Sequence, residues 1–309
     1  MLEGLPLVHS EDYDAPLPEG HRFPMSKFLL LRELLEAEGV AKAEQFVRPE
    51  PALREDLELV HEPGYLDAFI EGRLGAAAVR KIGLPWTERL VHRTITAVGG
   101  TIRTVELALE HGLACNTAGG THHAFPGHGS GFCILNDLAV AARVALERGW
   151  VERVLIVDLD VHQGDGTAFA LCGEPRAFTL SVHCAANFPL RKQVSDLDVE
   201  VEPGLEDGGY LAVVDRVVPE VLERVRPELV LYDAGVDVHR DDRLGKLELS
   251  DEGVRERDRR VISWCREAGI PTACVIGGGY DRDHRLLARR HSLLHRAASE
   301  VWAAERVSG

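Results

Sequence analysis

The stretch RVLIVDLDVHQGDGT, residues 153–167, decides the fold of this chain. Its first half is a run of apolar, mostly branched residues, which predicts a fully buried strand. Its second half carries Asp158, Asp160, His162 and Asp165, a dense polar group that directly follows the strand. A buried strand that ends in charged side chains is typical of α/β proteins, because ligands gather beyond the carboxyl ends of parallel strands.

Three more strands of this kind are predicted, with longer amphipathic segments around and between them. The further strands are residues 177–182, 228–232 and 271–276. The expected helices, in which apolar residues recur at helical spacing, are residues 24–38, 87–110 (interrupted by Gly99 and Gly100), 136–148, 207–226, 250–268 and 284–304. Buried strands that alternate with helices indicate a parallel sheet covered on both faces. Since no linker or repeat divides the chain, we expect a single domain over residues 1–309.

The composition argues against several classes of function. Lys and Arg number 35 and Asp and Glu 50, so the net charge is −15, which disfavours binding to nucleic acid or to an anionic membrane surface. No apolar run approaches the roughly 18 residues of a membrane span, and the first residues lack the features of a signal peptide. The six cysteines form no CxxC pair, so we expect reduced thiols in a cytoplasmic protein.

Asp160, His162 and Asp237 are predicted to hold a metal ion. Asp237 follows the strand at 228–232, so its carboxylate is expected at the same edge of the sheet. Carboxylates and an imidazole that face one point repel each other or lose solvation unless a cation lies between them. Three protein ligands leave one position open, the catalytic pattern, and a set without thiolate suits Zn²⁺ or Fe²⁺. The alternative is a network of ion pairs, but two such clusters on separate strand ends favour a metal.

His122 and His123 form a second candidate group in a loop flanked by glycines. Asp158 and Asp165 are not needed as metal ligands, and each could accept a ring N–H and so fix a tautomer. That arrangement gives two Asp–His pairs beside a metal, where one histidine could take a proton from water. The alternative is a pair of ordinary polar side chains that are hydrogen-bonded locally.

Aromatic residues near the strand ends complete the predicted site. Tyr280 follows three glycines, and its phenol could stabilise a developing oxyanion, although a tight turn with a surface tyrosine has the same pattern. Phe132 and Phe188 could line a narrow apolar slot for an aliphatic side chain, or belong to the core. The chain has no phosphate-binding loop, no dinucleotide-binding turn and no GxSxG motif.

Four motifs, in this order, resemble those of the histone deacetylase superfamily: GGTHHAFPGHGSGFCILND (119–137), VDLDVHQGDGT (157–167), YDAGVDVHRDDRLG (232–245) and GGGY (277–280). The resemblance begins at PLPEGHRFP, where Pro16 is the first residue, and runs through Tyr280. Residues 83–102 and 187–211 are most similar to the class IV branch and to bacterial relatives of the acetoin utilisation type. The implied fold is the arginase/deacetylase α/β fold, a roughly eight-stranded parallel sheet between helices.

The resemblance also implies roles for individual residues. It matches the zinc ligands to Asp160, His162 and Asp237. It matches the catalytic groups to the pair His123–Asp165 (general base, then acid), the pair His122–Asp158 (electrostatic partner) and Tyr280 (polarisation of the carbonyl). It matches the substrate tunnel to Gly131, Phe132 and Phe188, a structural K⁺ site to Asp158 and Ser181, and a product exit to Arg22.

The implied activity is metal-dependent removal of acetyl or other acyl groups from N-ε-acyl-lysine in proteins. Alternatives that remain open are deacetylation of small amines such as acetylpolyamines, binding of acyl-lysine without turnover, and a binuclear ureohydrolase. Gln163 stands where many family members have a second histidine. Residues 82–86 offer no carboxylate to hold a substrate backbone, which puts sequence-specific peptide recognition in doubt. The oligomeric state is left open.

Overall fold

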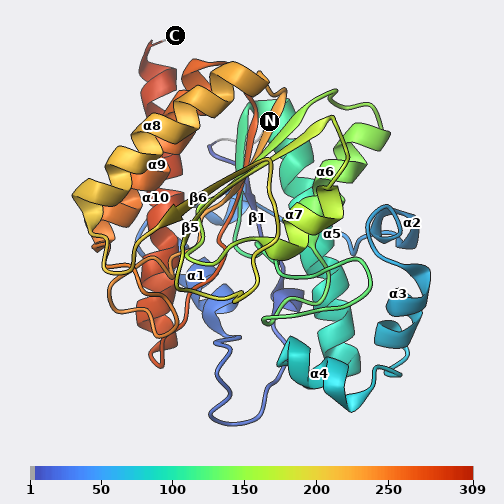
Figure 1. Ribbon diagram of the computed structural model, residues 1–309. Helices are drawn as coiled ribbons and strands as arrows, with labels where there is room; N and C mark the ends of the chain where they lie inside the picture. Colours follow the sequence, from blue (N-terminus) through green and yellow to red (C-terminus); the bar gives the residue numbers. More distant parts are fainter. Residues whose placement is uncertain (1–3, 309) are drawn as a thin grey trace.

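The computed structural model describes residues 4–308, which form an α/β fold around one eight-stranded parallel sheet (Figure 1). The strand order is β2-β1-β3-β8-β7-β4-β5-β6, and every neighbouring pair is parallel. The strands are β1 (Leu7–Val8), β2 (Phe46–Val47), β3 (Leu113–Asn116), β4 (Val154–Asp158), β5 (Ala177–Cys184), β6 (Leu197–Val201), β7 (Leu229–Asp233) and β8 (Thr272–Val275). The predicted fold class is therefore confirmed.

Helices cover both faces of this sheet (Figure 1). One face is covered by α1 (Lys27–Ala37), α8 (Asp207–Val225), α9 (Asp251–Glu267) and α10 (His284–Ser308). The other is covered by α5 (Glu88–His111), α6 (Asp137–Glu147) and α7 (Asp165–Leu171). The outer helices are α2 (Arg54–Leu57), α3 (Pro63–Ile70) and α4 (Ala76–Ile82), and the 3-10 turns are Glu11–Tyr13 and Ala43–Gln45. Within residues 4–308, no helix combines the length and apolar character of a membrane span.

The four strands predicted from apolar runs are confirmed as β4, β5, β7 and β8. All residues of β4, β7 and β8 are buried, which explains their unbroken apolar character. The helix starts follow capping chemistry: the Thr87 side chain accepts from the backbone N–H of Leu90 at 3.0 Å at the start of α5. Asn136 caps α6 in the same way, accepting from the Ala139 N–H at 2.9 Å.

The expected interruption at Gly99 and Gly100 is wrong, because α5 continues through both residues without a break. The two glycines are places of close approach. A Cβ on Gly99 would lie 2.0 Å from the backbone oxygen of Glu50, and one on Gly100 would lie 2.0 Å from the Tyr13 hydroxyl. The absence of side chains lets these neighbouring segments lie directly against the helix.

The Gly99→Ala substitution is expected to destabilise the protein by about 1–3 kcal/mol, because the backbone at Glu50 has to move. The measurement is the free energy of unfolding from urea titration. Gly64→Ala is the matched control, since Gly64 lies in helix α3 and a Cβ there meets nothing within 4 Å. The control should be neutral or stabilising. Equal effects of the two substitutions would contradict the close-approach explanation.

Candidate functional site

The loops that follow β3, β4, β7 and β8 meet beyond the carboxyl ends of the strands and bring the predicted site residues together. Asp160, His162 and Asp237 form one buried cluster, with one ligand atom from each within 4.8 Å of the others. The His162 Nδ1 lies 3.0 Å from Oδ1 of Asp160 and 3.1 Å from Oδ2 of Asp237. The loops after β4 and β7 supply these donors, because the two strands are neighbours in the sheet.

The donor set of this cluster fits a divalent cation. The other carboxylate oxygens are held by backbone donors: Gly278 N–H to Asp160 at 2.7 Å and Val161 N–H to Asp237 at 2.9 Å. A Cβ on Gly278 would lie 2.2 Å from the Asp237 carboxylate, so only glycine allows this approach. Burial alone would lower the pKa of His162, but Asp160 and Asp237 raise it to about 10. A bound cation would take the place of that proton between the same three side chains.

The predicted Asp–His pairs are both present. The His122 Nδ1 lies 2.8 Å from Oδ2 of Asp158, and the His123 Nδ1 lies 2.6 Å from Oδ1 of Asp165. Both rings are buried, and their centroids are 4.1 Å apart. Each carboxylate accepts from Nδ1, so Nε2 of each ring remains for other partners.

The two neighbouring imidazoles have opposite pKa shifts. Burial works against the charged form of His122, but Asp158 and Asp160 raise its pKa well above the usual value. Burial, and then the charge of His122, lowers the pKa of His123 to about 4. His123 is therefore neutral near pH 7 and able to accept a proton, while His122 carries a charge. Environments that shift the pKa values of two neighbouring groups in opposite directions are common at catalytic sites.

The loop that carries both histidines is anchored by the start of α6. Asn136 donates from Nδ2 to the backbone oxygens of His122, at 3.4 Å, and Ala124, at 3.1 Å. The Asp137 carboxylate accepts from the backbone N–H groups of Gly120, at 3.2 Å, and Thr121, at 2.7 Å. This side-chain anchoring holds the imidazoles on a fixed backbone.

Tyr280 faces the same centre from the loop after β8. Its ring lies 5.8 Å from the ring of Phe132, and Oδ2 of Asp242 accepts from its backbone N–H at 2.7 Å. Burial, and then the charge of Asp237, raises the pKa of the Tyr280 phenol well above its usual value. The phenol therefore remains a hydrogen-bond donor.

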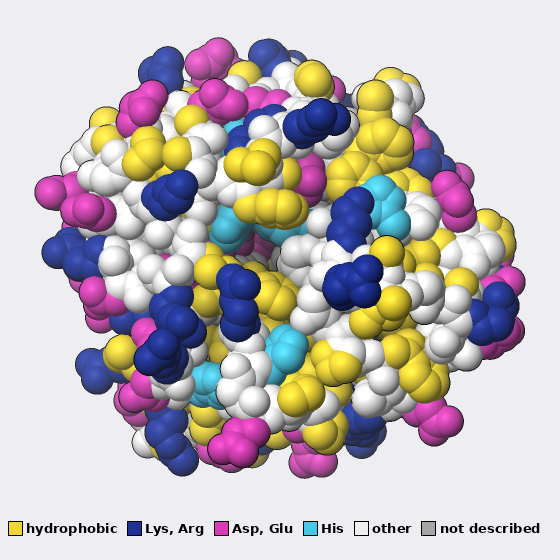
Figure 2. All heavy atoms as spheres, turned by 60° about the horizontal axis from the view of Figure 1, so that its bottom comes forward, with side chains coloured by type: hydrophobic (Ala, Val, Ile, Leu, Met, Phe, Trp, Pro, Cys, Tyr) yellow, Lys and Arg dark blue, Asp and Glu magenta, His cyan; other side chains and the backbone are white. Residues whose placement is uncertain are grey.

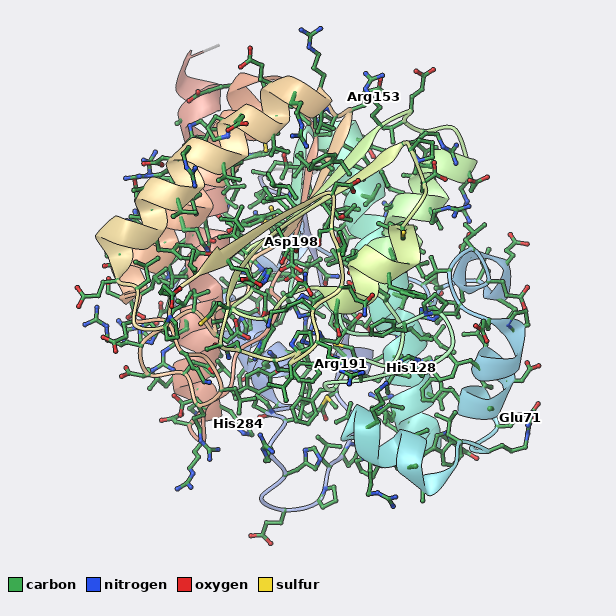
Figure 3. All side chains as sticks on the ribbon, in the orientation of Figure 1. Glu71, His128, Arg153, Arg191, Asp198 and His284 are labelled. Atoms are coloured by element: carbon green, nitrogen blue, oxygen red, sulfur yellow. The ribbon has the colours of Figure 1, made fainter. Side chains whose placement is uncertain are left out.

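A cavity of about 1170 Å³ leads from the surface to these residues, and its opening appears as the central hollow in Figure 2. Phe132 and Phe188, both predicted as tunnel walls, line it together with Gly131. The Phe188 ring lies 4.9 Å from that of His123 in an edge-to-face arrangement, and 43% of Phe188 is exposed. Figure 3 labels His128 and Arg191, which line the outer part of the same cavity. The cavity is lined by both polar and aromatic side chains, and the imidazoles of His123 and His162 are among them.

Arg22, predicted at a product exit, is not among the residues that line the inner cavity behind the site; it is exposed and lines the outer one. The inner cavity, about 30 Å³, instead has two buried cationic residues, Lys27 and Arg93. Lys27 donates to the backbone oxygens of Gly277, at 3.4 Å, and Gly279, at 3.5 Å. Burial lowers the pKa of Lys27 to about 8. This space has room for roughly one or two water molecules.

The predicted potassium residues, Asp158 and Ser181, are direct register partners on β4 and β5. The Ser181 hydroxyl lies 2.9 Å from Nδ1 of His183, and the Asp158 carboxylate faces His122. A potassium ion at this place stays a prediction.

Sequence reasoning assigned no role to several residues that the structure places in or beside the site. Asp233, the last residue of β7, is fully buried, with one carboxylate oxygen 3.7 Å from the His122 Nδ1. Asn187 donates to the Leu244 backbone oxygen at 2.8 Å, and its Nδ2 lies 3.4 Å from Nε2 of His162. Asp233 was visible in the sequence as a polar residue at a strand end. Nothing in the sequence pattern singles out Lys27 or Asn187.

Comparison with known proteins gives the class. Residues 21–294 match the histone deacetylase domain family. The chain is 58% identical over 299 residues to an uncharacterized protein of Picosynechococcus sp., covering 97% of this chain and 100% of that one. It is 30% identical to histone deacetylase 2 of Arabidopsis thaliana, over 90% of this chain and 75% of that one. It is 32% identical to the acetoin utilization protein AcuC of Staphylococcus aureus, over 74% of this chain and 64% of that one.

The chain belongs to the histone deacetylase family. The fold agrees: a histone deacetylase homologue from Aquifex aeolicus superposes with a TM-score of 0.79 at 24% identity, covering 96% of this chain and 84% of that one. Family membership supports a hydrolytic deacetylase that acts on an acylated substrate. The predicted recognition, including bacterial relatives of the acetoin utilisation type, is confirmed.

Proposed function

We propose that this protein hydrolyses the amide bond of N-ε-acyl-lysine side chains in proteins, with a divalent cation, Zn²⁺ or Fe²⁺, held by Asp160, His162 and Asp237. One observation carries the proposal. His162 of the donor cluster, the His123–Asp165 pair and Tyr280 all line one cavity, and Asp160 and Asp237 lie buried beside His162. A protein that only bound acyl-lysine would not need two Asp–His pairs there.

Asp160, His162 and Asp237 would hold the cation, which when bound would supply Lewis acidity. His123 takes the proton of the attacking water at Nε2, because Asp165 accepts from Nδ1 and fixes the tautomer. Tyr280 donates its phenolic hydrogen to the oxygen that becomes negative. His123 then gives the proton to the departing lysine amine. His122, charged beside Asp158, stabilises the negative charge that develops nearby.

We infer that the alkyl chain of an acyl-lysine lies beside Phe132 and Phe188, which both line the cavity. Phe132 has a φ of 66°, in the left-handed region, and its N–H donates to the Ile82 backbone oxygen at 2.7 Å. The ring packs between the buried ring of Phe23, 5.5 Å away, and the ring of Tyr280, 5.8 Å away. Two aromatic walls exclude water from the methylene groups and leave the amide at the imidazoles.

Removal of the metal is expected to abolish activity. The substrate is an acetyl-lysine peptide, and the assay compares protein as purified, after chelation, and after addition of Zn²⁺ or Fe²⁺. Activity should be lost to the chelator and restored by at least one ion, with about one bound ion per chain by elemental analysis. Asp237→Asn should lower both metal content and activity, because it removes a charged ligand.

Two outcomes would contradict the proposal. Full activity in chelated, metal-free protein would exclude a metal mechanism. An inactive protein that holds its metal and binds the peptide would favour acyl-lysine binding without turnover. A panel of longer acyl groups on the same peptide separates this second outcome from a preference for another acyl chain.

A further inference from the structure

The mouth of the cavity is bordered by positive charge. Five exposed cationic residues line it, and we call them the basic rim: Arg22, Arg80, Lys81, Arg191 and Lys246. They come from four separate segments: the loop before α1, the end of α4, the loop between β5 and β6, and the loop between β7 and α9. In Figure 2, dark-blue side chains lie on several sides of the central hollow. The positive charge therefore surrounds the entrance instead of forming a patch on one side.

The basic rim has no acidic counterpart. Asp165 is the one carboxylate among the residues that line the cavity, and it is buried against His123. None of the five rim residues forms an ion pair with the described part of the chain. Elsewhere, exposed arginines such as Arg54 and Arg176 pair with carboxylates at 2.5–2.8 Å. Lys246 Nζ donates to the backbone oxygen of Ala186 at 2.8 Å, and Lys81 Nζ lies 5.9 Å from the centre of the Phe125 ring. Neither contact neutralises the positive charge, so the rim can still act on a molecule that approaches the entrance.

The positive charge of the basic rim is opposite in sign to the net charge of the chain. The net charge is −15 and the sequence has only five lysines, of which Lys81 and Lys246 lie at this entrance. Arg80 and Lys81 also suit the last turn of α4, where cations interact favourably with the helix dipole. That explanation does not extend to Arg22, Arg191 or Lys246, which lie on loops.

We propose that the natural substrate is an acyl-lysine flanked by carboxylates, in an acidic segment of a protein. This inference rests on the proposed function, because it assumes that the lysine chain enters the cavity. Rim residues on opposite loops can contact carboxylates on both sides of the modified lysine. A surrounding of one sign raises the local concentration of oppositely charged substrate. The same field disfavours acetylpolyamines, which are cations, and lysine-rich tails.

The test uses three acetyl-lysine peptides of equal length whose flanking residues are Glu, Gln or Lys. With metal-loaded protein at low ionic strength, kcat/KM should be roughly tenfold or more higher for the Glu peptide than for the Lys peptide. The difference should shrink at 0.5 M salt, where charges more than a few ångströms apart are screened. The double variant Arg191→Glu/Lys246→Glu should remove or invert the preference.

The matched control is the double variant Arg216→Glu/Arg289→Glu, which makes the same change of charge on α8 and α10, away from the residues that line the cavity. It should keep the wild-type preference. Equal kcat/KM for the Glu and Lys peptides, or a double variant that changes all three peptides equally, would overturn the inference.

The experiment distinguishes failure of this inference from failure of the proposed function. If no peptide is hydrolysed, the proposed function fails in this form. The binding of the three peptides, each with the same fluorescent label, still reports on the rim by anisotropy. Tighter binding of the Glu peptide that is lost in the double variant supports the rim. Binding without charge preference overturns it. Hydrolysis of all three at equal rates keeps the proposed function and rejects the rim.

Discussion

The His123→Ala substitution is expected to lower kcat/KM on an acetyl-lysine peptide by about 10²–10⁴-fold, the range for loss of a general base. The imidazole is neutral near pH 7 because burial and the charge of His122 lower its pKa to about 4. The Asp165 carboxylate, 2.6 Å away, keeps Nε2 free to accept a proton. No other neutral base lies at that place in the described site, because His122 is held charged by Asp158.

The measurement is kcat/KM together with metal content and thermal stability, so that loss of the base is separated from loss of the metal or of the fold. His92→Ala is a matched control, since His92 is exposed on α5. Asp165→Asn should also be strongly impaired, because an amide can favour the wrong tautomer of His123. Near-normal turnover in His123→Ala would move the base role to another group.

The Tyr280→Phe substitution is expected to lower kcat by roughly 10²–10³-fold, as for loss of one oxyanion donor. The ring keeps its contact with Phe132, and Asp242 still accepts from the backbone N–H, so the loop should keep its place. The phenol of the wild-type protein is protonated at any working pH because burial, with Asp237 nearby, raises its pKa. The loss should therefore appear in kcat more than in KM.

A comparison of peptide binding with turnover tests this point. Tyr280→Phe should bind the acetyl peptide about as well as the wild-type protein does, and should unfold at a similar temperature. Full amidase activity in this variant would contradict the mechanism as written. A large loss of binding would indicate that the hydroxyl holds the ground state of the substrate instead.

Much of the fold could be predicted from the sequence, and particular strands show why. β4, β7 and β8 are buried along their whole length, so their apolar runs are unbroken. β1 and β2 have two residues each, too few for any pattern, and β3 follows α5 after a single glycine. β6, at the edge, is mostly half-buried and carries two acidic residues, so its sequence, LDVEV, does not stand out as a buried run.

The residues of the site likewise fall into those that the sequence predicts and those that it does not. The metal donors and the Asp–His pairs follow strands directly, so their meeting could be predicted from the rule for parallel sheets. Lys27 lies on α1, and its burial beside the loop at 277–279 depends on how that helix packs. The position of Arg22 at the outer entrance likewise depends on the path of a loop. Contacts that arise from packing between distant segments have no local signal in the sequence.

The three donor residues of the metal cluster also connect separate parts of the chain. Asp160 and His162 follow β4, whereas Asp237 follows β7, and α7, β5, β6 and α8 lie between the two strands in the sequence. All three can hold one ion only when β4 and β7 are paired. A cation bound there therefore adds RT ln(1 + [M]/Kd) to the free energy of unfolding, about 2.7 kcal/mol at a free concentration of 100 times Kd. The ion would act as a non-covalent cross-link across the centre of the sheet, and metal supply would affect the lifetime of the folded protein as well as its chemistry.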